Sequence, residues 1–166
     1  MKKVFSYADA ILYFNSYFSI LNSFSGKSCP PDWILFNNYC YLLKDHLLTW
    51  DQALSYCNGL GAALVKISGA EENDFVLDLS KQNTTVDKVW IGLKWYTGDD
   101  YYWYDSSVPG YTNWVPGQPN GGANEPCRSM YTAQRKENLP LTAAGYWNDV
   151  KCAGVPKIGI VCKRLP

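Results

Sequence analysis

The chain has no excess of either charge sign and few charged residues. Its 166 residues contain 15 Lys and Arg against 15 Asp and Glu, a formal net charge of zero, and 18% of them are charged, below the roughly 25% of an average soluble domain. Because nucleic-acid affinity comes mainly from basic side chains that neutralise phosphates, this balance argues against a nucleic-acid partner. The apolar runs are far shorter than the roughly 20 residues of a membrane-spanning helix, so we expect no membrane insertion.

The signatures of common enzyme and metal classes are also missing. The chain has one histidine, His46, and no CxxC, GxSxG, P-loop or HExxH sequence. His46 lies in a predicted loop without a triad partner. We therefore predict that the protein is not an enzyme and holds neither a zinc cluster nor a redox dithiol.

Cysteine, by contrast, is well represented, with six residues at wide spacing. An even number so spaced is typical of three disulfides, which form in an oxidising compartment, so we predict a secreted, extracellular protein. Six free buried thiols are the alternative. Fifteen pairings are open, and spacing alone does not choose among them. The residues are Cys29, Cys40, Cys57, Cys127, Cys152 and Cys162.

The first 25 residues differ in composition from the rest. Two lysines precede an apolar run, and Ser23 and Ser25 occupy the −3 and −1 positions of a cleavage site before Gly26. Polar residues such as Asp9 interrupt the run. We expect a weak signal peptide over 1–25 and a single domain over 26–166; a non-cleaved N-terminus and a membrane anchor are the alternatives.

The order of helices and strands predicted for the rest of the chain indicates one α+β domain. A short hairpin is predicted around Asn37–Asn38, and strands over 89–93 and 101–104. Two helices are predicted to begin at capping boxes, Thr49–Gln52 and Ser68–Glu71. A loop rich in Gly, Pro and Asn, over about 106–126, is long enough to need a function. The sequence Asn83–Thr85 is an N-glycosylation sequon, which predicts a glycoprotein.

This loop and the segment before Cys152 contain the candidate binding residues. If Cys127 pairs with Cys152, Glu125 approaches Asn148 and Asp149. Side-chain oxygens are the ligands that Ca²⁺ prefers, whereas zinc and copper favour nitrogen and sulfur. The alternative is that these residues only form turns. The oxygen-bearing set is Gln118, Asn120, Glu125, Asn148 and Asp149.

Two short sequences, WIGL at Trp90–Leu93 and WND at Trp147–Asp149, follow a pair of cysteines at Cys29 and Cys40. Together with the other cysteines, these separated motifs resemble the C-type lectin-like domain family, in its long form with six cysteines. The resemblance covers roughly residues 29–164. It implies the C-type lectin fold, with two helices packed on small antiparallel sheets and a long calcium-binding loop. It also implies the disulfides Cys29–Cys40, Cys57–Cys162 and Cys127–Cys152. The motifs are Cys29–Trp33, Cys40–Tyr41, the region from Ala53 to Leu64, Trp90–Leu93 (WIGL), and Trp147–Asp149 (WND) followed by Cys152.

The resemblance further implies that the five oxygen-bearing residues bind a Ca²⁺ ion whose shell two sugar hydroxyls complete, so they are also the carbohydrate-binding residues. The peptide before Pro119 is expected to be cis. The expected ligands are cell-surface or microbial glycans, as in innate immunity. Because monosaccharide binding is expected to be weak, avidity would need homo-oligomers or multivalent surfaces. Further calcium ions bound by some members are not expected, because only Asp99 among Trp95, Asp99, Gly121 and Pro126 is a suitable ligand.

The sequence departs from the family at Gln118. The mannose-type loop reads Glu-Pro-Asn and the galactose-type loop Gln-Pro-Asp, whereas this chain has Gln118-Pro119-Asn120. Only two carboxylates then face the ion, which predicts weak calcium binding. Because residues 121–124 include no tryptophan to stack on galactose, we expect mannose or fucose ligands rather than galactose. The alternative is a protein-binding domain with a degenerate calcium loop.

Overall fold

The computed structural model describes residues 28–82, 86–98, 100–132, 143–155 and 158–166. The predicted signal peptide, the Asn83 sequon and Asp99 lie outside these residues. The first elements form the predicted hairpin, β1 (Ile34–Phe36) and β2 (Tyr39–Lys44). Asn37 and Asn38 adopt φ of 43° and 66° in its turn, the left-handed conformation that two-residue hairpin turns require.

The strands join one hydrogen-bonded sheet of order β1-β2-β8-β4-β6-β7, with β3 paired to β8 and β5 to β4. All pairings are antiparallel except that of β4 with β8. The α+β lectin fold class is confirmed, but the strands form a single mixed sheet rather than separate antiparallel ones. The remaining strands are β3 (Ala63–Leu64), β4 (Lys88–Thr97), β5 (Asp100–Trp103), β6 (Cys127–Tyr131), β7 (Trp147–Val150) and β8 (Ile158–Arg164).

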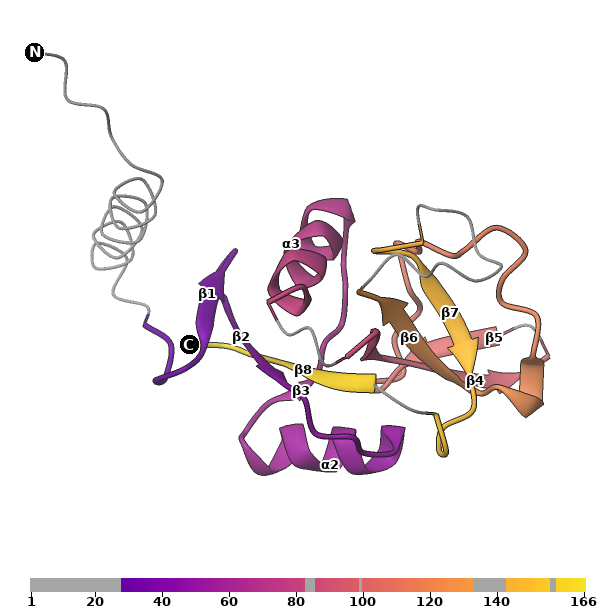
Figure 1. Cartoon of the computed structure of the whole chain (residues 1–166), viewed down its shortest axis with the longest axis horizontal. Helices are drawn as coiled ribbons and strands as arrows, with labels where there is room; N and C mark the ends of the chain where they lie inside the picture. Colours follow the sequence, from indigo (N-terminus) through magenta and orange to yellow (C-terminus); the bar gives the residue numbers. More distant parts are fainter. Residues whose placement is uncertain (1–27, 83–85, 99, 133–142, 156–157) are drawn as a thin grey trace, which may run out of the picture.

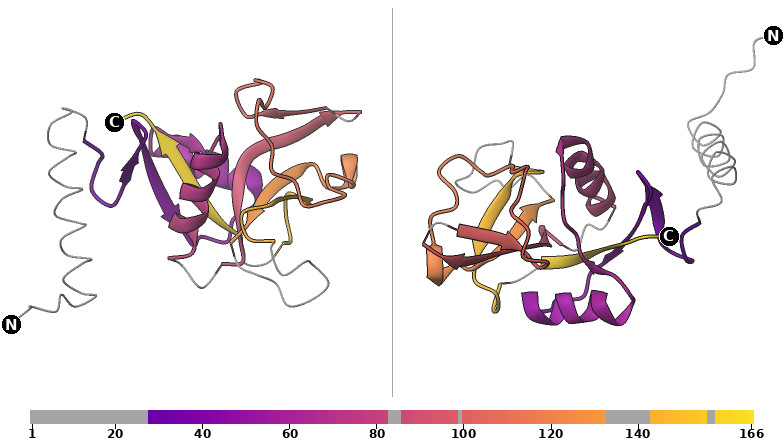
Figure 2. Two further views of the ribbon diagram at one scale, coloured as in Figure 1. Left: turned by 90° about the horizontal axis from the view of Figure 1, so that it is seen from above. Right: turned by 180° about the vertical axis from the view of Figure 1, so that it is seen from behind.

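Two helices lie on opposite sides of the β2–β8 part of the sheet (Figures 1 and 2). Helix α2 (Trp50–Gly59) begins at the predicted capping box: the Gln52 amide donates to the Thr49 hydroxyl, and the Thr49 amide donates to the Gln52 side chain. Helix α3 (Ala70–Ser80) is capped by Gly69 without a side-chain bond. The predicted Ser68–Glu71 box is therefore wrong. The Ser68 amide instead donates to the Glu72 carboxylate, at 2.8 Å.

Three disulfides and two buried clusters hold the domain. The pairs Cys29–Cys40, Cys57–Cys162 and Cys127–Cys152 are those that the family resemblance implies. One cluster lies under α3 and includes Trp103 and Trp147; the other lies under α2 and includes Trp50 and Trp90. Of the described residues, none belongs to a helix long and apolar enough to cross a membrane.

Buried polar contacts join α3 to the strand that carries the WND sequence. The Trp147 indole donates to the Asn73 Oδ1 at 2.8 Å, and the Asn73 Nδ2 donates to the Gly145 carbonyl at 3.1 Å. Both residues are buried, so these bonds satisfy groups that water cannot reach. The start of β7 is therefore anchored in the core, which fixes the positions of Asn148 and Asp149 in the same strand.

Candidate functional site

The loop between β5 and β6 folds back along β7, at the end of the molecule away from the C-terminus (Figure 1). The Trp147 amide donates to the Asn113 carbonyl at 2.6 Å, and the Val115 amide to the Trp147 carbonyl at 2.9 Å. A 3₁₀ turn, η1 (Gly122–Asn124), leads into β6. These bonds bring the Gln118–Asn120 segment to the exposed side of β7.

Asp149 is the centre of the site. Its side chain is fully buried, and one carboxylate oxygen, Oδ2, accepts the backbone N–H groups of Asn120 at 2.8 Å and Gly121 at 2.6 Å. The other oxygen, Oδ1, is buried and has no hydrogen-bond partner. A buried carboxylate oxygen without a hydrogen-bond partner is costly, so this atom is open to a hydrogen-bond donor or a bound cation.

The Gln118–Pro119 peptide bond is cis, as expected from the resemblance. It lies in the surface segment whose next amide, that of Asn120, donates to Asp149. Gln118 Oε1 is likewise buried without a hydrogen-bond partner. The loop and β7 thus each contribute one unpartnered oxygen to this region.

Glu125 and Gly121 pack against one another in the turn before β6. A Cβ atom at Gly121 would lie 2.5 Å from the Glu125 Cβ and 2.8 Å from its Oε2. Since Gly121 has φ of −89°, glycine is required for space rather than for backbone conformation. Glu125 therefore lies over the backbone that donates to Asp149.

Asn148 completes the set of predicted residues. It is half-buried in β7, and its Nδ2 donates to the Asp149 carbonyl at 2.5 Å. Backbone contacts thus place the five predicted residues in one region of the chain. The Asn120 and Gly121 amides bond Asp149, Glu125 packs against Gly121, and Gln118 and Asn148 adjoin these residues in sequence. Asn120 is exposed and accessible to a ligand.

This oxygen-rich arrangement fits a hard cation such as Ca²⁺. Two of its oxygens, Asp149 Oδ1 and Gln118 Oε1, are buried without hydrogen-bond partners. Among the described residues, no three His, Cys, Asp or Glu side chains are grouped to hold a metal. An ion here would therefore depend on amide oxygens for much of its coordination shell.

Arg128, which the sequence-based prediction did not include, lies directly beneath this site. It is fully buried in β6 and stands opposite Asp149 in the β6–β7 register. Burial lowers its pKa, and the Asp149 and Glu125 carboxylates act in the opposite direction. The available signal was a charged residue directly after Cys127.

A hollow of about 420 Å³ adjoins the site. Pro119 and Asn120 line it from the loop, Trp95 and Tyr101 from β4 and β5, and Arg128 from below. Aromatic side chains therefore lie near Asn120 even though residues 121–124 contain none. They come from the neighbouring hairpin, and only the register of β4 with β5, which pairs Trp95 with Tyr101, reveals this.

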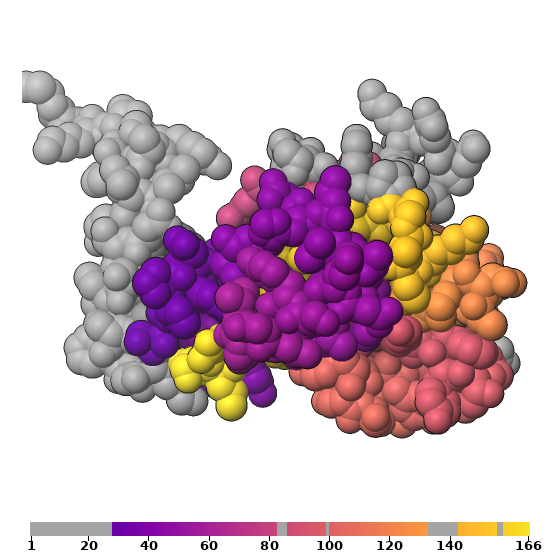
Figure 3. Space-filling view, turned by 90° about the horizontal axis from the view of Figure 1, so that it is seen from below, coloured from indigo at the N-terminus to yellow at the C-terminus, as the bar shows by residue number. Residues whose placement is uncertain are grey.

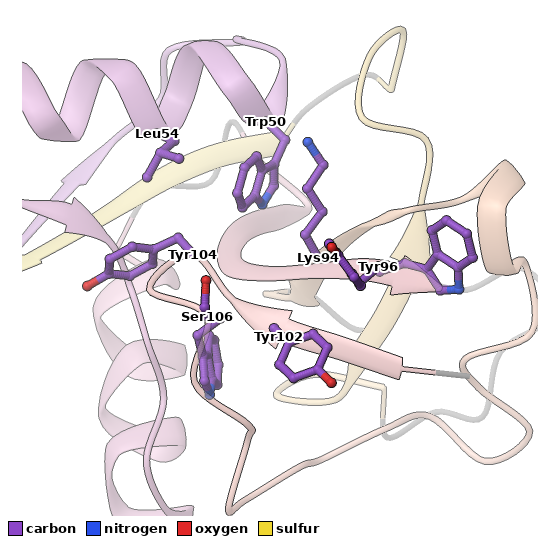
Figure 4. A pocket seen from close by; sticks show the side chains of 9 residues that line it. Trp50, Leu54, Lys94, Tyr96, Tyr102, Tyr104 and Ser106 are labelled. Atoms are coloured by element: carbon purple, nitrogen blue, oxygen red, sulfur yellow. The ribbon is translucent and has the colours of Figure 1, made fainter. Parts of the chain in front are cut away.

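A second hollow, of about 460 Å³, lies between α2 and the β4–β5 hairpin, two segments that are neighbours on the face shown in Figure 3. Its lining is aromatic, with Trp50, Tyr96, Tyr102 and Tyr104 around Lys94 (Figure 4). Lys94 bonds Asp51 at 3.0 Å. No carboxylate lines this hollow, in contrast to the region around Asp149.

Other singled-out residues have structural positions. Trp90, Trp103 and Trp147 are buried and Trp114 is half-buried, as predicted for core residues. His46 is exposed and lies near the Tyr56 ring, 5.2 Å between centroids.

Residues 46–164 match the family model described as Lectin C-type domain. The alpha-N-acetylgalactosamine-specific lectin of Patiria pectinifera is 35% identical over 147 residues, which cover 81% of this chain and 82% of that protein. The C-type lectin domain family 4 member G of Mus musculus is 30% identical over 145 residues, or 84% of this chain. The chain spans only 44% of that second relative's length.

Solved structures show the same fold. The carbohydrate-recognition domain of cow CD23, crystallised in the presence of a GlcNAc2Man3 oligosaccharide, matches with a TM-score of 0.70 and 34% identity, covering 84% of this chain and 98% of that domain. A calcium-independent type II antifreeze protein also matches with a TM-score of 0.70, at 24% identity, covering 84% and 96%. That second likeness concerns the fold alone.

Proposed function

Because the chain belongs to the C-type lectin domain family, whose members bind ligands and are not enzymes, we propose that it is a calcium-dependent, carbohydrate-binding lectin. Gln118, Asn120, Glu125, Asn148 and Asp149 would hold the ion and contact the sugar. The observation that carries the proposal is the pair of buried, unpartnered oxygens, Asp149 Oδ1 and Gln118 Oε1. A bound Ca²⁺ would supply the positive charge for these oxygens and a coordination site for sugar hydroxyls.

The protein's own residues set the geometry around a bound sugar. Glu125 and Asp149 are acceptors for hydroxyl protons, and the amides of Asn120 and Asn148 are donors. The Asn120 and Gly121 backbone N–H groups fix the Asp149 carboxylate, so its orientation is set before any ligand arrives. Binding a vicinal diol at this position needs no movement of β7.

Calcium affinity is expected to be weak, with a dissociation constant at or above about 10⁻⁴–10⁻³ M. Glu125 and Asp149 supply two negative charges, and Gln118 supplies an amide where a third carboxylate would bind more tightly. The buried Arg128 cation beneath the site weakens calcium binding further.

The proposal of mannose or fucose ligands rests on the loop sequence, because residues 121–124 include no tryptophan. Gln118 both donates and accepts hydrogen bonds, so it does not by itself select one hydroxyl geometry. Trp95 and Tyr101 line the hollow beside Asn120, which gives galactose-type ligands an aromatic surface that the loop sequence lacks. A lectin specific for alpha-N-acetylgalactosamine is among the relatives, so the test must include both sugar classes.

The alternative function is protein binding with a degenerate calcium loop. The aromatic hollow of Figure 4 favours it, because Tyr96 is 73% exposed and Tyr104 41% exposed at its edge. Large exposed aromatics are enriched where proteins meet. The antifreeze neighbour is calcium-independent, and the fold alone therefore does not decide between the two functions.

Thermal unfolding with and without calcium tests the proposal. A ligand that binds only the folded state raises the midpoint, so 5–10 mM Ca²⁺, about ten times the expected dissociation constant, should raise Tm. Glu125→Gln should abolish the shift, whereas Glu71→Gln, an exposed carboxylate on α3, should leave it intact. An unchanged Tm in the native protein would favour the protein-binding alternative.

A glycan array in millimolar Ca²⁺, repeated with chelator, then identifies the sugar. We expect chelator-sensitive binding to mannose or fucose glycans. Binding that persists in chelator, or no binding at all, would contradict the lectin proposal. We also propose that the protein acts outside the cell, as the disulfides suggest, and gains avidity by binding multivalent surfaces or by forming homo-oligomers.

A further inference from the structure

Arg128 is the most unusual buried residue of the described chain. Its side chain is 0% exposed, although a guanidinium is among the costliest groups to remove from water. Alternation along β6 explains its position: Cys127 forms its disulfide on one face, so Arg128 points to the other, beneath the long loop. A buried charge is tolerated only where the surrounding contacts offset the free energy of removing it from water.

The guanidinium contacts β5 and two separate parts of the long loop, one at Trp114 and one at Glu125. Its Nη1 donates to the Glu125 carbonyl at 2.6 Å and to the Cys127 carbonyl at 3.3 Å. Its centre lies 5.5 Å from the Trp114 ring and 5.8 Å from the Tyr101 ring. The long loop, the β5 strand and the turn before β6 therefore meet on one cation.

The charge balance of the site explains why a cation is buried at this position. Without a metal ion, the Glu125 and Asp149 carboxylates repel each other in a partly buried setting. Arg128 stands opposite Asp149 in the register and binds the Glu125 backbone. It therefore offsets one of the two negative charges from below, where no exchangeable ion is needed.

We propose that Arg128 is a positioning residue, an internal cation that keeps the long loop folded when no calcium is bound. The loop conformation, including the bonds from Asn120 and Gly121 to Asp149, then exists before the ion arrives. The site is preformed, and a ligand does not have to order it. This inference concerns the proposed calcium site, but it is tested without calcium, so it can hold even if no ion binds.

Hydrogen exchange of the full chain in chelator measures the order of the loop. The amides of Asn120 and Gly121 report directly, because both donate to Asp149. We expect loop exchange in the native protein to change less than about threefold between chelator and 10 mM Ca²⁺. In Arg128→Met, exchange in chelator should be at least about tenfold faster, as expected when a local opening becomes easier.

Two further variants separate positioning from a general loss of stability. Arg128→Lys keeps the charge but lacks the guanidinium fork, and should recover a large part of the protection. Lys163→Met removes a half-buried cation that pairs with Glu72 at 2.6 Å, near the C-terminus. It should speed exchange in β2 and β8 but leave the loop unchanged.

Two results would overturn the inference. One is a native loop that exchanges freely in chelator, which would show that the loop is not held without an ion. The other is a folded Arg128→Met whose loop amides are as protected as in the native protein. If the Met variant does not fold, hydrogen exchange of the native protein and of the Lys variant decides the question. Loop amides left unprotected in the Lys variant would show that the positive charge alone does not hold the loop.

Discussion

Gly121 shows how closely the candidate site depends on single atoms. Its backbone N–H bonds Asp149, and its missing side chain leaves the space that Glu125 occupies, with only 2.5 Å to the position of an added Cβ. One residue therefore places both carboxylates. No charge or motif draws attention to it in the sequence, because its role depends on the fold of the turn.

Gly121→Ala should displace the Glu125 carboxylate and weaken calcium binding by about 10- to 100-fold, the range typical when the support of a ligand is lost. Gly110→Ala is the matched control, since it lies in the same loop with nothing within 4 Å of an added Cβ. Calcium titration followed by Tm compares the two. Equal affinities in the two variants would mean that Glu125 does not hold the ion.

The five candidate residues could be named from the sequence, because they lie in the WND sequence, in the Gln-Pro-Asn loop and, for Glu125, two residues before Cys127. Arg128 could not, for a physical reason. Its burial depends on which face of β6 is covered, and that is decided by the pairing with β7 and by Trp114, which comes from a loop 14 residues earlier.

At the scale of elements, a charged turn fixes the start of the long loop. The Lys66 ammonium bonds Asp105 at 2.8 Å and the Ser107 hydroxyl at 2.6 Å, and the Ser107 amide also donates to Asp105. The hydrogen bond from Lys66 is the main cause that lowers the pKa of Asp105 to about 2, followed by the bond from Ser107. The turn after β5 is thus held by Lys66, which lies two residues after β3.

Lys66→Met should bring the Asp105 pKa back towards its ordinary value and cost at most about 1 kcal/mol, because the pair is partly exposed and screened by solvent. A carboxylate with a lowered pKa stabilises the fold above about pH 4, and this contribution is lost as the pH falls towards 2. The native protein and the variant should therefore differ in Tm at pH 7 and converge near pH 2.

Urea unfolding or NMR titration of the Asp105 carboxyl checks this pH dependence. Lys81→Met, which removes an exposed pair with Asp78, is the control and should change stability little at either pH. A Lys66→Met variant with the same low Asp105 pKa as the native protein would contradict the assigned cause.

Local signals predicted elements well where the partners are near in sequence. The Thr49–Gln52 box and the Asn37–Asn38 turn are both as expected. The second box failed because α3 begins one residue later than predicted, at Gly69, an N-cap without a side chain. The third helical residue is then Glu72, which accepts from the Tyr41 hydroxyl at 2.7 Å and pairs with Lys163. The parallel pairing of β4 with β8 joins residues about 70 positions apart, and no local pattern encodes it.

At the scale of the whole molecule, the Cys57–Cys162 disulfide spans 105 positions and ties α2 to β8. In the chain-entropy model a loop of this length is worth about 4.8 kcal/mol, against about 2.8 kcal/mol for the 11 positions of Cys29–Cys40. Replacing both cysteines of the long pair by alanine should therefore destabilise the fold by about 2 kcal/mol more than the same change at the short pair.

Denaturant unfolding of the two double variants measures this difference. Stabilities lowered equally would show that strain or residual structure, and not loop length, dominates the effect of these disulfides.

The first and last described residues lie at one pole of the domain, and the long loop lies at the opposite pole (Figures 1 and 2). Strand β1 and the end of β8 are neighbours at one pole, and the Gln118–Asn120 segment forms part of the other. Domains anchored side by side through the pole that carries β1 and the end of β8 would all present their long loops in the same direction, towards a repeating sugar surface.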